Sequence, residues 1–174
     1  MKIVNITATV QMEREFDLDS LVNSLPNAEM SIQWVKLRMP PKNNYVAFYP
    51  SGKFLITGVK SNQELNEVAE NVVIFLKEHE IDNNIKGITI NNYVLIDKLD
   101  FEVNLDDLIV KLDSTNATYE PEQFIGLSFK DENNITFTLF HSGKINITGV
   151  KSLENLEEKI NSFKQLIYNK SFNE

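Results

Sequence analysis

Lysine, serine and threonine side chains recur at fixed spacing in two segments of the sequence. The segment SGKFLITGVKS begins at Ser51, and SGKINITGVKS begins at Ser142. Each segment offers ammonium groups that can bind phosphates and hydroxyl groups that can donate a hydrogen bond to a base or peptide acceptor. A two-fold arrangement of the copies would place matched cations symmetrically, and duplex DNA has a pseudo-two-fold axis of its own. A duplex is therefore one ligand that these segments suit.

The residues needed for catalysis or for a metal site do not occur in recognisable patterns. The two histidines, His79 and His141, stand in no metalloprotease or triad spacing. The acid pairs at 106–107 and 157–158 are expected on solvated helix faces. The sequence has no cysteine and six glycines, none in a phosphate-binding loop. An enzyme is therefore the weaker alternative, and we expect no catalytic residue, no metal and no cofactor.

Composition bounds the class of protein. The 174 residues, 42% of them hydrophobic, suffice for a packed core in one domain or two small ones. No apolar run reaches the roughly 20 residues of a membrane helix, and no signal pattern opens the chain, so we expect a soluble intracellular protein. The net charge of −8 argues against nucleic-acid binding by the whole surface but leaves room for a basic patch on one face.

The recurring segments belong to a longer internal repeat. Upstream of them, FDLDSLVNSL from Phe16 matches VNLDDLIVKL from Val103, and Asn5 matches Asn92. The junction falls near 82–86, where IDNNIKG is poor in apolar residues. We therefore predict two copies, residues 1–84 and residues 85–174.

Each copy should contain strand, helix, several antiparallel strands and helix. Alternation over 2–12 indicates a half-buried strand, and a helix should follow the cap residue Asp17 and end before Pro26. The remaining elements expected in the first copy are strands at 35–39, 45–49 and 53–57 and a helix at 62–78. Those expected in the second copy are strands at 93–99, 127–130, 135–140 and 144–148 and helices at 105–112 and 153–167. This order predicts an α+β fold.

Alternation also separates a core face of the strands from an open face. The residues assigned to the open face are Asn5, Thr7, Thr9, Lys36, Arg38, Tyr45, Ala47, Tyr49, Lys53, Leu55 and Thr57, and Asn92, Val94, Ile96, Ser128, Lys130, Thr136, Thr138, Phe140, Lys144, Asn146 and Thr148. Several of these are basic and none is acidic, although acidic residues outnumber basic ones by 25 to 17 in the chain. Such a face suits a polyanion whose bases and phosphates are both contacted. The alternative is an ordinary solvated sheet surface, on which lysine and threonine are common.

Taken together, these residues make the chain resemble the TATA-binding protein family over nearly its whole length. The most specific elements are the two SGK-x-x-x-TG-x-KS segments, LPNAE from Leu25, YEPEQF from Tyr119 and NITATV from Asn5. The resemblance implies a pseudo-two-fold saddle, with one curved antiparallel sheet and two helices per repeat on its convex side. It also implies a general transcription initiation factor that binds and bends A·T-rich promoter DNA through the minor groove and recruits transcription factor B. Its location would be the cytoplasm of an archaeon or the nucleus of a eukaryote.

The resemblance assigns roles to residues at matching positions. Base contacts fall on Asn5, Asn92, Thr57, Thr148, Leu55 and Val94. The DNA-kinking aromatics are Phe124 and Phe140 in the second copy and, as the nearest counterparts, Tyr49 and Trp34 in the first. Phosphate contacts fall on Arg38, Lys53, Lys60, Lys130, Lys144 and Lys151, and transcription factor B would dock at Glu120, Glu122 and Gln123. Amide and hydroxyl donors are chemically apt, because A·T pairs show only acceptors in the minor groove.

The sequence departs from the family pattern on the open face. Thr7 and Asn146 stand where valine is usual, and Thr138 and Lys36 replace aliphatic residues. A less apolar face recovers less free energy from excluding water, so we expect weaker or less selective DNA binding, with the stronger kink in the second copy. The rival interpretation is a protein-interaction module whose polar face holds a peptide or inhibitor. A self-dimer of the free protein also remains open.

Overall fold

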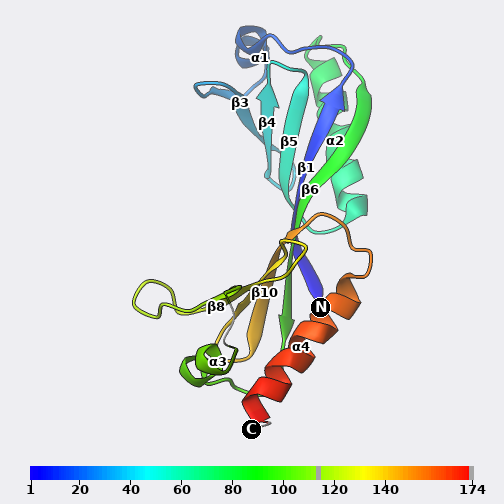
Figure 1. Ribbon diagram of the computed structural model, residues 1–174. Helices are drawn as coiled ribbons and strands as arrows, with labels where there is room; N and C mark the ends of the chain where they lie inside the picture. The colour runs from blue at the N-terminus through cyan, green and yellow to red at the C-terminus, as the bar shows by residue number, and fades with distance from the viewer. Residues whose placement is uncertain (113–114, 173–174) are drawn as a thin grey trace. The chain divides into compact units, whose positions relative to one another are not determined.

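The computed structural model describes residues 1–112 and 115–172. The first repeat contains β1 (Lys2–Met12), α1 (Leu18–Ser24), β2 (Glu29–Met30), β3 (Val35–Met39), β4 (Asn44–Tyr49), β5 (Lys53–Val59) and α2 (Asn62–Glu78). The second contains β6 (Ile85–Lys98), α3 (Leu105–Leu112), β7 (Ala117–Thr118), β8 (Leu127–Lys130), β9 (Thr136–Leu139), β10 (Lys144–Val150) and α4 (Leu156–Phe172). The strand order is β2-β3-β4-β5-β1-β6-β10-β9-β8-β7 (Figure 1).

The chain forms two compact units. The N-terminal unit comprises Val4–Asn92, and the C-terminal unit comprises Met1–Ile3 together with Tyr93–Glu174. Strand β6 passes from one unit to the other, so the unit boundary lies inside a strand. The division at residue 84 predicted from self-similarity concerns the repeat and stays a prediction. Among the described helices, none is both long and apolar enough to span a membrane.

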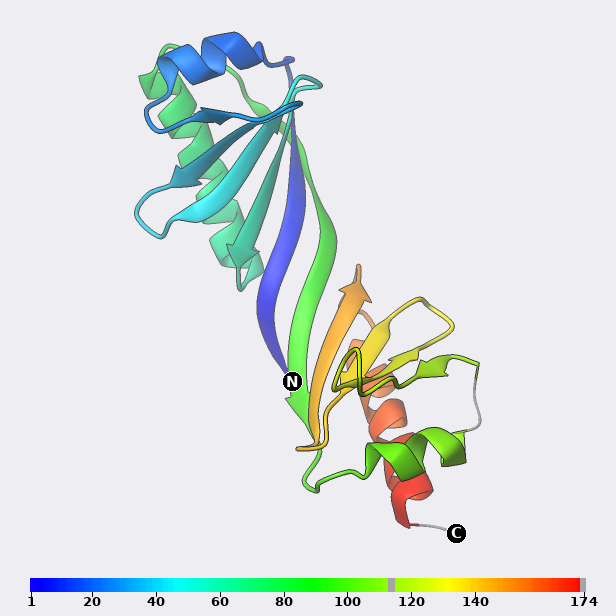
Figure 2. The ribbon, with the colours of Figure 1, turned by 90° about the vertical axis from the view of Figure 1, so that its left-hand side faces the viewer.

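The core of the N-terminal unit lies between its sheet and its helices. Ile6, Ala8 and Val10 alternate inward along β1 and are fully buried. They share this core with Phe48 of β4 and with the apolar stripe of α2, which is buried at Leu65, Val68, Ala69, Val72 and Leu76. Figure 2 shows α2 running along one face of these strands. Spacing of three and four residues on the helix and of two on the strands is what brings these side chains together.

The C-terminal unit repeats this construction around a pair of phenylalanine rings. Phe137 of β9 and Phe163 of α4 are stacked with their ring centroids 4.5 Å apart. Around them, α4 buries Leu156, Ile160 and Ile167, and α3 buries Leu105 and Leu108. Both units therefore cover one sheet face with helices and leave the other face open.

Most predicted elements are confirmed, as is the α+β fold with two helices in each repeat. Asp17 caps α1 as expected, because its Oδ1 accepts hydrogen bonds from the backbone N–H groups of Asp19 and Ser20. The two-residue strands β2 and β7 were not predicted, since they are too short to show alternation. Strand β6 begins at Ile85, whereas the predicted strand begins at Tyr93. The first half of the strand has no alternating buried residues, so periodicity could not reveal it. Helix α4 begins at Leu156 rather than at Leu153, after Asn155 with φ +54°.

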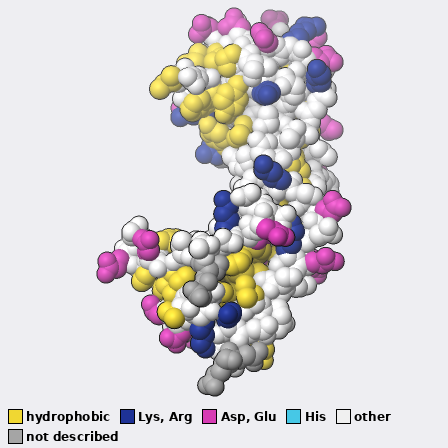
Figure 3. Space-filling model, viewed as in Figure 1, with side chains coloured by type: hydrophobic (Ala, Val, Ile, Leu, Met, Phe, Trp, Pro, Cys, Tyr) yellow, Lys and Arg dark blue, Asp and Glu magenta, His cyan; other side chains and the backbone are white. Residues whose placement is uncertain are grey.

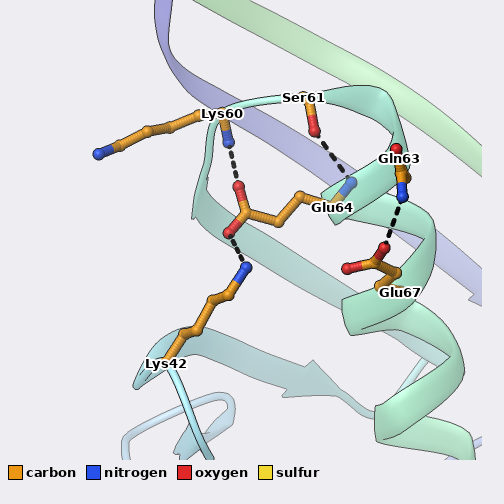
Figure 4. A network of polar contacts seen from close by, with 6 residues as sticks. All are labelled: Lys42, Lys60, Ser61, Gln63, Glu64 and Glu67. Carbon is orange, nitrogen blue, oxygen red and sulfur yellow. Dashed lines mark hydrogen bonds and ion pairs between the residues drawn. The ribbon is translucent and has the colours of Figure 1, made fainter.

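The start of α2 is fixed by a network around Glu64 (Figure 4). Ser61 Oγ accepts a hydrogen bond from the Glu64 backbone N–H at 3.1 Å, as expected of an N-cap serine. The Glu64 carboxylate in turn accepts from the Lys60 backbone N–H at 2.8 Å and pairs with Lys42 Nζ at 3.0 Å. These contacts lower the pKa of Glu64, with the Lys60 N–H as the main cause. The network anchors the backbone of Lys60 and leaves its ammonium group pointing away from Glu64.

Candidate nucleic-acid interface

The open face of each unit is defined here as the row of strand side chains opposite the helices. In the N-terminal unit, Thr7 and Thr9 of β1 lie on it and are half-exposed, between the fully buried Ile6, Ala8 and Val10. Ala47 shares this face by register with Lys36 and Leu55, but its short side chain is only 1% exposed. In Figure 3 hydrophobic side chains gather over β3, β4 and β5, and Asp and Glu side chains lie mostly at the margin of this unit.

Asn5 is held in one orientation by its neighbours on the open face. Gly58, at φ +92° beside an irregularity in the β1–β5 register, donates its N–H to Asn5 Oδ1 at 2.8 Å. Asn5 Nδ2 lies 3.3 Å from Thr57 Oγ1, which is 3.1 Å from Thr7 Oγ1. The carbonyl oxygen is engaged by the backbone and one N–H of Nδ2 donates to Thr57 Oγ1, so the group left for a ligand is the second N–H of Nδ2, a donor.

The open face of the C-terminal unit has the same framework with different side chains. Asn92, Val94 and Ile96 are half-exposed along β6, while Tyr93 and Leu95 are buried. Asn146 of β10 lies in register between Ile96 of β6 and Thr138 of β9. Its Oδ1 is buried and accepts no hydrogen bond from any residue that the structure describes. An unpaired buried acceptor costs about 1–3 kcal/mol. A donor group on a ligand would therefore satisfy this oxygen if the amide turned outward.

Each unit carries an aromatic pair at one end of its open face. Phe124 and Phe140 meet edge to face with their centroids 6.0 Å apart, and Phe124 is 51% exposed. Trp34 and Tyr49 lie 6.2 Å apart in the N-terminal unit, and both are half-exposed. The structure thus brings together the predicted aromatic residues of each repeat.

Glycine leaves room for the phenylalanine pair. A Cβ atom at Gly126 would lie 2.7 Å from Phe124 Cε1 and 2.8 Å from Thr138 Cγ2. Such separations are too short for carbon atoms, whose contacts are favourable at about 3.5–4.0 Å. Gly126 therefore lets the two rings sit against the sheet.

The predicted phosphate-binding cations are all exposed. They are Arg38, Lys53, Lys60, Lys130, Lys144 and Lys151. Arg38 differs from the lysines, because its guanidinium lies 5.1 Å from the centroid of the Tyr45 ring and donates to the Asn43 carbonyl at 3.3 Å. Its position is therefore fixed by the protein itself.

Glu29 is an acidic residue on the open face that the sequence did not predict there. Glu29 of β2 is the register partner of Lys36, and their charged groups lie 2.8 Å apart. The contact lowers the pKa of Glu29 and raises that of Lys36. Because β2 has only two residues, no periodicity could place Glu29 on this face. The ion pair with Glu29 partly neutralises the charge of Lys36.

Two exposed apolar side chains were also missed. Ile125, beside Phe124, is 70% exposed, and Ile32 is 94% exposed in the turn that Ser31 N and Trp34 O close at 2.8 Å. The inserted side chains predicted from the sequence are all aromatic. The signal available in the sequence was Ile32 itself, an apolar residue between the polar residues Ser31 and Gln33 that could have been predicted as an exposed wedge.

The predicted partner-binding residues lie in one turn of the C-terminal unit. The Glu120 carbonyl accepts hydrogen bonds from Gln123 N and Phe124 N, both at 2.9 Å, and the side chains of Glu120, Glu122 and Gln123 are exposed. Beside this turn lies a cavity of about 530 Å³, whose lining includes Tyr119, Ile125, Phe140 and Lys144. This turn therefore places the carboxylates of Glu120 and Glu122 next to a mainly apolar cavity.

The histidines have structural partners. His79 Nδ1 lies 2.8 Å from the Phe75 carbonyl, and His141 Nδ1 lies 2.7 Å from the Val103 carbonyl. Within residues 1–112 and 115–172, no group of three or more His, Asp or Glu side chains could hold a metal ion.

Comparisons with known proteins agree over most of the chain. The family model described as "Transcription factor TFIID (or TATA-binding protein, TBP)" matches residues 1–79 and 87–170. The TATA-box-binding protein of Pyrobaculum calidifontis is 33% identical over 173 residues, covering 97% of this chain and 84% of that protein. The protein of the same name from Pyrodictium occultum is 34% identical over 166 residues, covering 91% and 81%. Among solved structures, Methanococcus jannaschii TBP superposes with a TM-score of 0.85 at 29% identity, covering 97% of this chain and 98% of that one.

Proposed function

Because this chain belongs to the TATA-binding protein family of transcription factors, we propose that it binds A·T-rich promoter DNA through the minor groove and bends it. The observation that carries the proposal is the fixed amide of Asn5. Its Oδ1 is engaged by Gly58 N–H at 2.8 Å, so the group offered to a ligand is a donor. A·T pairs present only acceptors in the minor groove, whereas a G·C pair adds the guanine amino donor, so a fixed donor favours A·T.

The aromatic pairs support the bending part of this proposal. Proteins that bend DNA through the minor groove insert apolar side chains between base steps, and phenylalanine and isoleucine both serve as wedges. Phe124 with Phe140, and Tyr49 with Trp34 or the exposed Ile32, are the groups available for insertion. Phe124 is supported by Gly126 and Phe140, whereas Ile32 extends from a turn, so we infer the stronger kink in the half contacted by the C-terminal unit.

We propose that the turn at 119–125 recruits transcription factor B. Two exposed carboxylates, Glu120 and Glu122, stand beside the apolar cavity, and a basic partner surface with an apolar side chain would fit both. Changing Glu120 and Glu122 to lysine should abolish the supershift by transcription factor B while binding of the duplex itself is retained. A supershift of wild-type strength would remove this turn from the interface.

The direct test of DNA binding is a titration of two labelled duplexes at fixed salt. One carries a TATA sequence, and the other has the same base composition in scrambled order. We expect the TATA duplex to bind tighter by tenfold or more. For comparison, proteins that recognise specific sites typically bind them at least about 10³ times more tightly than non-specific DNA. Equal affinity for the two would contradict promoter recognition, and the absence of binding would contradict DNA binding altogether.

A further inference from the structure

The two open faces differ at matched positions. Leu55 in the N-terminal unit lies in register between Thr9 and Ala47. At the corresponding place in the C-terminal unit, Asn146 lies between Ile96 and Thr138. Leu55 offers a ligand neither a donor nor an acceptor, whereas Asn146 offers both. By contrast, Asn5 matches Asn92 and Thr57 matches Thr148, so these polar groups occur in both units.

Asn146 also has an unsatisfied acceptor. Its Oδ1 is buried and has no hydrogen-bond partner among the described residues, although it lies in a row that faces outward. By contrast, the acceptor of Asn5 is satisfied by Gly58 N–H. Rotation of the Asn146 amide toward a ligand would break no hydrogen bond at Oδ1, so the side chain can turn either its oxygen or its nitrogen outward.

In a minor groove this freedom has a definite consequence. The guanine N2 amino group is the one donor that base pairs display there, and an apolar side chain opposite it leaves it unpaired. Resting on the DNA-binding function proposed above, we propose that Asn146, with Thr138 beside it, makes the half-site contacted by the C-terminal unit tolerant of a G·C pair. The half-site contacted by Leu55 and Ala47 excludes one.

The repeat supplies the matched variants for the test. Asn146→Leu gives the C-terminal unit the residue of the N-terminal unit, and Leu55→Asn makes the reciprocal change. Thr138→Ala, which matches Ala47, is a third variant that removes the Thr138 hydroxyl together with its γ-methyl group. Near-ultraviolet circular dichroism and thermal melting of each variant establish that it folds, so a loss of binding is assigned to the interface.

Affinities are measured for a TATA duplex and for duplexes in which single A·T pairs, one position at a time, become G·C or inosine·C. Inosine is guanine without the 2-amino group, so its pairs isolate the donor. We expect the wild type to lose less than threefold for G·C at a position in one half-site and tenfold or more in the other. Asn146→Leu should lose tenfold or more at the tolerant position, and inosine·C should restore its binding. Leu55→Asn should create tolerance in the second half-site.

Three results would overturn the inference while leaving DNA binding in place. They are equal penalties for G·C in both half-sites of the wild type, an unchanged profile for Asn146→Leu, and a penalty that persists with inosine·C. A wild type that binds none of the duplexes would overturn both the proposed function and this inference.

Discussion

At the scale of single residues, the proposed function depends on donors held in place by the backbone. Asn5 is oriented by Gly58, whose positive φ and place beside a register irregularity direct its N–H inward. The pattern of alternating residues predicted that Asn5 lies on the open face, but not which end of its amide faces out. That information depends on the bulge at Gly58, which appears only when β1 and β5 are paired.

We predict that Asn5→Ala weakens binding of a TATA duplex by about tenfold, since one good base contact is worth about 1–3 kcal/mol. Titration of the labelled duplex at constant salt measures this. Asn71→Ala, on the exposed side of α2, is the matched control and should bind as the wild type does. If both variants bind equally, Asn5 does not contact the bases.

The phenylalanine pair gives a second prediction at this scale. Gly126→Ala should displace Phe124 or Phe140 and reduce the bend of a TATA duplex, because its Cβ has no room between the ring and Thr138. Gly87→Ala is the control, since a Cβ there meets nothing within 4 Å. Energy transfer between dyes at the two duplex ends reports the bend. An unaltered bend with Gly126→Ala would argue against insertion by this pair.

At the scale of elements, the sequence predicted the helices and long strands because each buries a periodic face. It did not predict β2, and with it the Glu29–Lys36 pair, because two residues carry no period. The α2 box of Ser61 and Glu64 is readable as S-x-x-E, whereas the matching place in the second repeat holds Asn155 at φ +54°. The later start of α4 follows from this difference.

We predict that Glu64→Gln lowers the free energy of unfolding by about 1 kcal/mol at pH 7, a shift in Tm of about 2–4 °C. The pKa of Glu64 is lowered from 4.5 by the Lys60 N–H and by Lys42, so its stabilisation is present above pH 4.5 and is lost as the pH falls through the folded-state pKa. The Tm values of the wild type and of Glu64→Gln should therefore differ at pH 7 and converge at acidic pH. Glu70→Gln, at an exposed position of α2, should melt with the wild type at both pH values.

At the scale of the whole molecule, an acidic chain with a net charge of −8 must bind a polyanion through a limited set of cations. Each phosphate contact releases counterions, so log K should fall steeply with log salt, and Lys53→Ala or Lys144→Ala should reduce the slope by about 1. Lys111→Ala, on α3, should leave it unchanged. A flat salt dependence would instead favour the protein-interaction module, whose ligand releases no comparable counterions.

In the proposed function, the open faces recognise A·T-rich DNA from its minor groove. Replacing every A·T pair of the TATA site by inosine·C keeps the minor-groove pattern, since the 2-amino group is absent, and changes the major-groove pattern to that of G·C. We predict that the affinity for this duplex stays within about threefold of that for the TATA duplex, while the G·C duplex binds at least tenfold more weakly. Binding of the inosine duplex as weakly as the G·C duplex would contradict the account.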